Sequence, residues 1–157
     1  MHLHKYEKIW LIFGIMALII FLSVVGVSAF HQGHTPSGGH MKIDPDKVSE
    51  TAPFDQPGVH KKEDGTYEVV MVGKTFGYDP GKVQVPAGKE IMFTVTSSDV
   101  VHSFSIVGTN VNMMVVPGEV NHKKHTFQEP GTYLVICNEY CGSGHHFMST
   151  EIEVVEQ

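Results

Sequence analysis

The pattern of apolar and polar residues divides the chain into three parts. From Ile9 to Phe30 the residues are apolar almost throughout and none is charged. A helix of that length spans about 33 Å, enough to cross a hydrocarbon core of about 30 Å. The pattern therefore predicts a transmembrane helix over residues 9–30, preceded by a short N-terminal segment, residues 1–8.

Lysines indicate the orientation of this helix. Lys5 and Lys8 precede the apolar stretch, and no Lys or Arg follows it until Lys42. Because positive charge stays on the cytoplasmic side, we expect a cytoplasmic N-terminus and an extracytoplasmic remainder. Val27–Ala29 also resembles a signal-peptide cleavage site, so a cleaved leader is the alternative. The apolar stretch is longer than a usual signal peptide contains, which favours an uncleaved anchor.

Residues 31–65 have the composition of a tether. They are rich in Gly, Pro, Ser and Asp and contain few large apolar residues. Histidines are scattered through them at irregular spacing, and a solvated linker explains that pattern better than a metal site does. These histidines are His31, His34, His40 and His60.

Residues 66–157 have the pattern of an all-β domain. Short stretches rich in Val, Ile, Phe and Tyr recur between Pro-Gly and other turn residues, and no amphipathic helix is present. This spacing is typical of a β-sandwich. The predicted strands are 67–73, 82–86, 90–96, 102–107, 111–116, 121–127, 131–137 and 150–155.

The charge of the chain limits its partners. The formal net charge is −6, and only Lys5, Glu7 and Lys8 among the charged side chains precede the apolar stretch. Nucleic acid is excluded as a partner, because phosphate contacts need a basic face. A basic soluble partner is compatible with this charge, and so is a role in solubility alone.

Candidate metal ligands gather in the loop between the last two predicted strands. Cys137 and Cys141 are the only cysteines, and His145 and Met148 follow within the same short run. Thiolates, an imidazole and a thioether form a soft ligand set that favours copper. His102, at the start of an upstream strand, is the candidate for a further nitrogen ligand.

Other interpretations use fewer of these residues. A disulfide between Cys137 and Cys141 would close a very small loop and give His145 and Met148 no role. Zinc sites seldom use Met. A mononuclear blue-copper site would leave the second cysteine unexplained. A dicopper site gives every one of these side chains a role.

The motif C-x3-C-G-x2-H-x2-M, together with V-H-S-F around His102, resembles the copper A domain of cytochrome c oxidase subunit II. The resemblance covers essentially the whole chain. The single span resembles most the subunit II of b-type, ba3-like haem–copper oxidases. It implies a cupredoxin-like Greek-key β-sandwich behind one transmembrane helix.

The resemblance also implies a binuclear copper A centre. Cys137 and Cys141 would bridge both coppers. The remaining ligands would be His102 and Met148 on one copper, and His145 and the backbone carbonyl of Glu139 on the other. In a-type relatives an acidic side chain at the Glu139 position also helps to bind magnesium, so a magnesium ion is a further expectation there.

The implied function is electron entry into a terminal oxidase in the cytoplasmic membrane of a prokaryote. Reduced cytochrome c, or a small copper protein, would give electrons to the dicopper centre. Haem in subunit I would then receive them for reduction of oxygen to water. The alternative is a membrane-tethered mononuclear cupredoxin that acts as an electron shuttle; a copper-delivery protein is a third possibility.

Two features depart from the family pattern or add to it. The only tryptophan is Trp10, so the exported part lacks the entry tryptophan of a-type subunits, and Phe76 and Tyr78 are the candidates to replace it. Core aromatic residues are the alternative for both. Glu7 stands where b-type relatives place an acid at the mouth of a proton path, so we expect it to assist proton uptake. An interfacial acid paired with lysine is the alternative.

Overall fold

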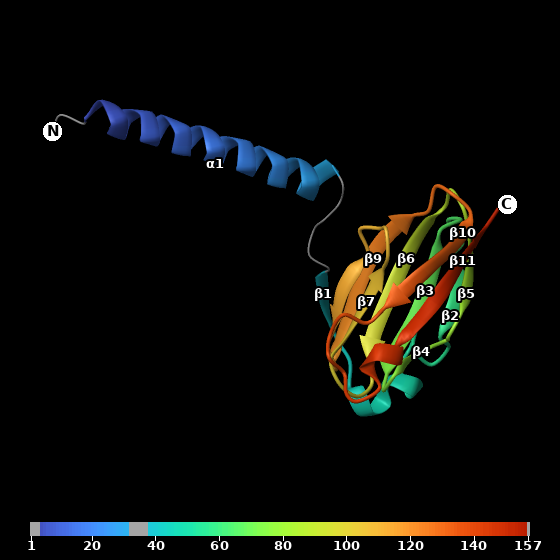
Figure 1. Cartoon of the computed structure of the whole chain (residues 1–157). Coiled ribbons are helices and arrows are strands. Elements are labelled where there is room, and N and C mark those ends of the chain that lie inside the picture. Colours follow the sequence, from blue (N-terminus) through green and yellow to red (C-terminus); the bar gives the residue numbers. More distant parts are fainter. Residues whose placement is uncertain (1–3, 32–37, 157) are drawn as a thin grey trace. The chain divides into compact units, whose positions relative to one another are not determined.

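The computed structural model describes residues 4–31 and 38–156, which fall into two units (Figure 1). The first contains helix α1, Lys5–His31. The second contains eleven strands and two 3-10 helices, η1 and η2. Residues 32–37 of the predicted tether, the first three residues and Gln157 lie outside the described residues.

Helix α1 contains the whole stretch predicted to cross the membrane and begins one turn before it. It is apolar on all sides, as expected of a segment surrounded by lipid. The backbone N–H of His4 donates to the Glu7 carboxylate at 2.8 Å. Because the first N–H groups of a helix have no partner within it, Glu7 helps to fix the point where α1 begins.

Two sheets form a β-sandwich. The first sheet places its strands in the order β1 (Gly38–Lys42), β9 (Glu119–Thr126), β6 (Glu90–Ser97), β3 (Tyr67–Lys74) and β2 (Gly58–Lys61), with β4 (Gly77–Asp79) paired to β3. The order in the second is β5 (Val83–Pro86), β11 (Ser149–Val155), β10 (Gly131–Ile136), β7 (His102–Ile106) and β8 (Asn112–Val115). The β3–β6 and β5–β11 pairs are parallel, and the other strand pairs are antiparallel.

Alternating side chains fill the space between the sheets. In β6, Ile91, Phe93 and Val95 are fully buried. Phe93 meets Phe104 of the opposite sheet, with ring centroids 5.6 Å apart. Burying one such side chain contributes roughly 1.5–3 kcal/mol. The predicted strands all occur, with ends that differ by a residue or two, because alternation marks the buried face of each.

The domain begins well before residue 66, which corrects the predicted tether. Strand β1 pairs with β9, and β2 pairs with β3. Between them, η1 (Pro45–Glu50) buries Val48, and the turn after it buries Phe54. A second core cluster forms against one sheet from Val48, Phe54, Val70, Val72 and Val120. A few large apolar residues suffice to hold a segment whose average composition is that of a linker.

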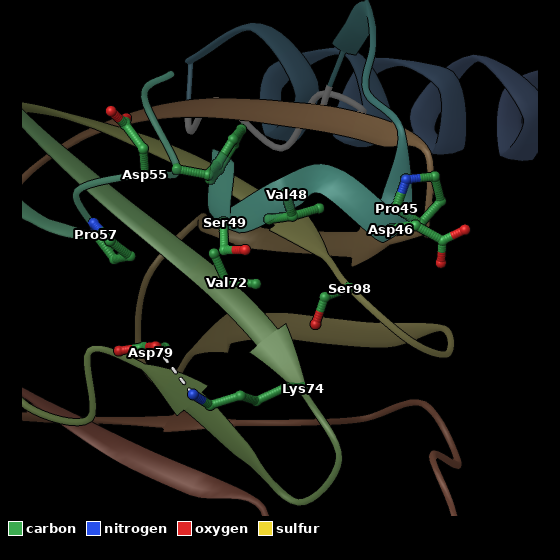
Figure 2. Close-up of a pocket in the computed structure, with 11 residues that line it drawn as sticks. Pro45, Asp46, Val48, Ser49, Asp55, Pro57, Val72, Lys74, Asp79 and Ser98 are labelled. Carbon is green, nitrogen blue, oxygen red and sulfur yellow. Dashed lines mark hydrogen bonds and ion pairs between the residues drawn. The ribbon is translucent and has the colours of Figure 1, made fainter. Parts of the chain in front are cut away.

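Residues 38–61 thus form an added N-terminal segment of the domain. Figure 2 shows how part of this added segment meets the end of β3. A cavity of about 570 Å³ lies there, with Val48 and Val72 among its lining residues. Lys74 of β3 and Asp79 of β4 form an ion pair at 2.9 Å on the same cavity wall. None of the predicted metal ligands lines this cavity, but the ion pair joins the two strands that flank the β3–β4 turn.

Candidate metal centre

The ligand loop, residues 137–148, connects β10 to β11, as predicted. Its two ends are held together, since Cys137 N–H donates to the carbonyl of Met148 at 3.3 Å. Within the loop, His145 N–H donates to Gly142 and Phe147 N–H donates to Gly144, which forms the short helix η2, His145–Phe147. The loop therefore folds back on itself and brings the backbones of its first and last residues together.

Two buried thiols lie at the centre of this loop. Both cysteines are free, and 6–8% of each is exposed. The sulfur of Cys141 lies 3.5 Å from the Met148 sulfur and 3.6 Å from His145 Nδ1. The sulfur of Cys137 lies 3.1 Å from the carbonyl oxygen of Glu139. The four side chains and one carbonyl predicted from this run thus converge.

His102 reaches the same point from β7. It is fully buried, and a ring nitrogen and both cysteine sulfurs lie within 4.8 Å of one another. The pairing of β7 with β10 produces this approach. The Ser103 N–H also donates a hydrogen bond to the Cys137 sulfur at 3.4 Å. Ser103 Oγ also accepts a hydrogen bond from Asn138 N–H, which fixes the start of the loop against β7.

The two ring nitrogens of His102 have different surroundings. Nε2 lies 2.8 Å from Asp99 Oδ1, whereas Nδ1 is buried without a hydrogen-bond partner among the described residues. A buried polar atom without a partner is costly unless a ligand engages it. With Nε2 donating to the carboxylate, Nδ1 carries the lone pair that a metal ion needs.

The site favours a cation. Burial raises the pKa of the Cys141 thiol, and the nearby Cys137 adds to this effect. Burial opposes ionisation of Asp99 as well. Hydrogen bonds from Thr75, His102 and Val100 outweigh it, so the Asp99 pKa falls to about 2 and the carboxylate is ionised. A bound cation would offset the cost of two buried thiolates.

The donor set fits copper. Two thiols, two imidazoles and a thioether are soft or borderline ligands, and such sulfur-rich sets select copper over hard cations. Two structural observations support a metal here: Nδ1 of His102 has no hydrogen-bond partner among the described residues, and the two cysteine thiols are free.

The other predicted residues lie at different depths. Tyr78 is buried, and its hydroxyl donates to the Ser103 carbonyl at 2.5 Å. This position favours the alternative that Tyr78 is a core aromatic residue. Phe76 is 39% exposed and contacts the ligand loop. The Glu139 side chain is partly exposed. Glu7 lies at the start of α1, in the other unit.

Asp99 and Thr75 were not among the predicted site residues. Thr75 donates to Asp99 through its backbone N–H, at 2.5 Å, and through its hydroxyl. One signal could have identified Asp99: an acid three residues before a candidate histidine ligand, in the turn that precedes its strand. For Thr75 no local signal exists, because its contact joins residues far apart in the chain.

Comparisons with known proteins agree with the fold and identify the family. The family model for the periplasmic domain of cytochrome c oxidase subunit II matches residues 70–155. Cytochrome c oxidase subunit 2 of Thermus thermophilus is 41% identical over 96% of this chain and 92% of its own length. That relative matches the span as well as the domain, which confirms the predicted resemblance to cytochrome c oxidase subunit II.

Solved structures give the same result. A chain of a heme-copper terminal oxidase dimer is 30% identical, with a TM-score of 0.80, and covers 96% of this chain and 100% of that one. The periplasmic domain of subunit II of cytochrome oxidase from Bradyrhizobium japonicum is 25% identical, with a TM-score of 0.54. It covers 57% of this chain and 84% of that one, and it confirms the cupredoxin-like sandwich.

The helix α1 and the periplasmic-domain match fit a single-pass membrane protein, and the sulfur-rich loop fits copper. The chain therefore belongs to the cytochrome c oxidase subunit II family and is the electron-transfer subunit of a haem–copper oxidase complex.

Proposed function

We propose that this chain holds a binuclear copper A centre. Cys137 and Cys141 would bridge the two metals, with His102 and Met148 on one and His145 and the Glu139 carbonyl on the other. The observation that carries the proposal is the pair of buried free thiols with the other donors on either side of them. When bound, such a copper pair accepts and releases one electron at a time.

The protein contributes rigidity. His102 is anchored by Asp99, and the loop is closed by the hydrogen bond between Cys137 and Met148. Ligands held in this way need little movement when the charge of the site changes, and a small rearrangement permits fast electron transfer. Burial of the sulfurs also excludes water from the site.

We propose that the electron donor docks on the apolar side chains next to these ligands. Five large side chains in or beside the ligand segments are 37–79% exposed: Phe76, Val100, Val101, Tyr140 and Phe147. Their character favours a docking contact that is more apolar than charged. The donor would be cytochrome c or a small copper protein, and Phe76, whose ring contacts the ligand loop, is the candidate entry residue.

From the copper site the electron would pass to haem in subunit I, where oxygen is reduced to water. Lys5 and Lys8, in the first turn of α1, support an N-terminus on the cytoplasmic side of a prokaryotic membrane, with the copper domain outside. A magnesium ion at the Glu139 carboxylate and proton uptake assisted by Glu7 both remain predictions.

Copper stoichiometry and electron paramagnetic resonance test the proposal on the full-length chain in detergent. We expect about two coppers per chain, a purple colour and a seven-line hyperfine pattern from one electron shared by two copper nuclei. His145→Ala should abolish that pattern, whereas His146→Ala, on the adjacent exposed side chain, should preserve it.

One copper per chain and a four-line pattern would contradict the binuclear centre. That outcome would instead support the mononuclear electron shuttle, which needs only one of the two cysteines.

A further inference from the structure

The β3–β4 turn, Lys74–Gly77, holds the one described residue other than glycine with a positive φ. Phe76 has φ of 67°. This left-handed conformation is unfavourable for a residue with a side chain, and it persists only where surrounding contacts fix it. The contacts of Phe76 therefore indicate what the turn does.

The ring of Phe76 packs directly on the ligand loop. A methyl group at Gly144 would lie only 2.5 Å from Phe76 Cγ and 2.7 Å from both Cδ atoms. At Gly142 it would lie 3.1 Å from Cε1, and Gly142 itself has φ of +127°. The aromatic ring thus occupies the space that side chains at these two positions would need. These two glycines lie between the predicted ligands Cys141 and His145.

The residues beside Phe76 contact the other half of the site. Thr75 donates its backbone N–H and its hydroxyl to Asp99, which holds His102 Nε2. Gly73, just before the turn, leaves room for the His102 ring, since a methyl group there would lie 3.2 Å from its Cδ2. Across β3 and β4, Lys74 and Asp79 form the ion pair visible in Figure 2.

We propose that Phe76 is a positioning residue for the ligand loop. Its ring holds Gly142 and Gly144 in the conformation that presents Cys141 and His145, and it does so before metal arrives. Through Thr75 the same turn fixes His102, so one short segment aligns ligands that are far apart in the chain. The proposal rests on the proposed copper function of these ligands and assigns Phe76 a role that does not involve the electron donor.

The other contacts of the loop show why such a residue is needed. The backbone hydrogen bonds described for the loop mostly join its own residues. Its two aromatic side chains, Tyr140 and Phe147, are 79% and 75% exposed and so offer little packing. Without the Phe76 ring, the glycine segment would be free to take other backbone conformations.

The test uses the full-length chain in detergent and two measurements that involve no electron donor. One is the rate at which the reduced, copper-loaded chain gives up Cu(I) to a bathocuproine chelator. The other is amide hydrogen exchange of the metal-free chain over residues 138–148. We expect Phe76→Ala to speed copper release by about tenfold and to raise exchange in this loop, while exchange in β6 stays the same.

Two comparisons identify the ring contact as the cause. Phe76→Tyr keeps the ring and should behave as the wild type, and Phe147→Ala removes an exposed ring from the same loop and should do so too. Gly144→Ala displaces the Phe76 ring and should reproduce the effects of Phe76→Ala. Because both changes remove one contact, the double variant should be no worse than either single one.

Wild-type release and exchange in Phe76→Ala would overturn the proposal, as would additive effects in the double variant. If Phe76→Ala fails to fold, Gly144→Ala provides the same comparison with the ring retained. A one-copper resonance pattern in the wild type would contradict the binuclear centre. The copper release rates of the variants could still be compared with that of the wild type, so failure of the binuclear proposal and failure of the Phe76 proposal are distinguishable.

Discussion

Asp99 and His102 lie 2.8 Å apart, carboxylate oxygen Oδ1 to ring nitrogen Nε2, and this contact determines which nitrogen of the histidine is available to a metal ion. The other nitrogen, Nδ1, is buried without a hydrogen-bond partner among the described residues. A carboxylate beyond the ligand fixes both the tautomer and the orientation of the ring.

Replacement of Asp99 by alanine should therefore weaken copper binding although Asp99 is not a ligand. We expect a loss of about 10–100-fold in copper affinity, measured by competition with a chelator. Asp99→Asn, whose amide oxygen can still accept from Nε2–H, should lose less. Asp55→Asn, an exposed acid on the added N-terminal segment, is the control. Equal affinities for Asp99→Ala and the wild type would show that the ring is held by packing alone.

Tyr78→Phe should reduce stability and leave electron entry unchanged. The Tyr78 hydroxyl donates to the buried carbonyl of Ser103, and its loss leaves that oxygen without this donor. We expect the free energy of unfolding to fall by roughly 1–2 kcal/mol. Tyr133→Phe is the matched control, since its hydroxyl bonds the Glu129 carbonyl at an exposed position. Slower reduction by the donor, with stability unchanged, would instead favour Tyr78 as an entry residue.

Phe54→Ala should destabilise the domain although Phe54 lies in the segment first interpreted as a tether. Its side chain is 2% exposed and belongs to the second core cluster. Removal of a buried phenylalanine ring costs about 3–5 kcal/mol. Met41→Ala, at a 54% exposed position in the same segment, should change stability little. Chemical unfolding monitored by near-ultraviolet circular dichroism would measure the stability of both variants. If Phe54→Ala were as stable as the wild type, the segment would be a linker, as first interpreted.

The free energy of unfolding should decrease as the pH falls, because of His125. Burial lowers its pKa below 6.5, while its ring packs edge-on against Phe127 with centroids 4.7 Å apart. As the pH falls from about 6.5 towards the folded pKa, the unfolded chain binds a proton that the folded chain does not, and the free energy of unfolding decreases. His125→Phe should flatten this part of the pH profile of the metal-free chain. His146→Ala, at an exposed position, should leave the slope unchanged; a wild-type slope in His125→Phe would assign the effect to another group.

Glu7→Gln tests the predicted role in proton uptake. The carboxylate accepts the N–H of His4 at the start of α1, a hydrogen bond that a glutamine oxygen can also accept. The helix should therefore form as before, while turnover and proton pumping of the assembled oxidase decrease. Unchanged turnover and pumping would identify Glu7 as a helix-capping residue at the membrane surface.

The parts of the fold that sequence could predict are those governed by local pattern. Alternation in β6 marks Ile91, Phe93 and Val95 as inward-facing without reference to any partner strand. The loop ligands lie within one short run, so their spacing alone brings them together. The segment around Val48 and Phe54 was missed because its order comes from contacts with Val70, Val72 and Val120, far along the chain.

Phe76 and Tyr78 illustrate a second limit. Residues two apart in a strand face the same side of a sheet, so the sequence offers no reason to separate them. The left-handed conformation at Phe76 breaks that rule, because it turns the chain just before β4 begins. Tyr78 then lies in the core and Phe76 on the loop. A backbone angle that depends on distant packing cannot be read from the two aromatic residues themselves.

The closure of the ligand loop has a consequence for how such sites evolve. Ile136 and Ser149 are paired across β10 and β11, and the whole ligand run is inserted between these two neighbours. A run with a different set of donors could replace it without disturbing any strand of the sandwich. Exchange of this one insert could thus convert a two-metal site to a one-metal site, provided that the new insert keeps a glycine where the Phe76 ring lies.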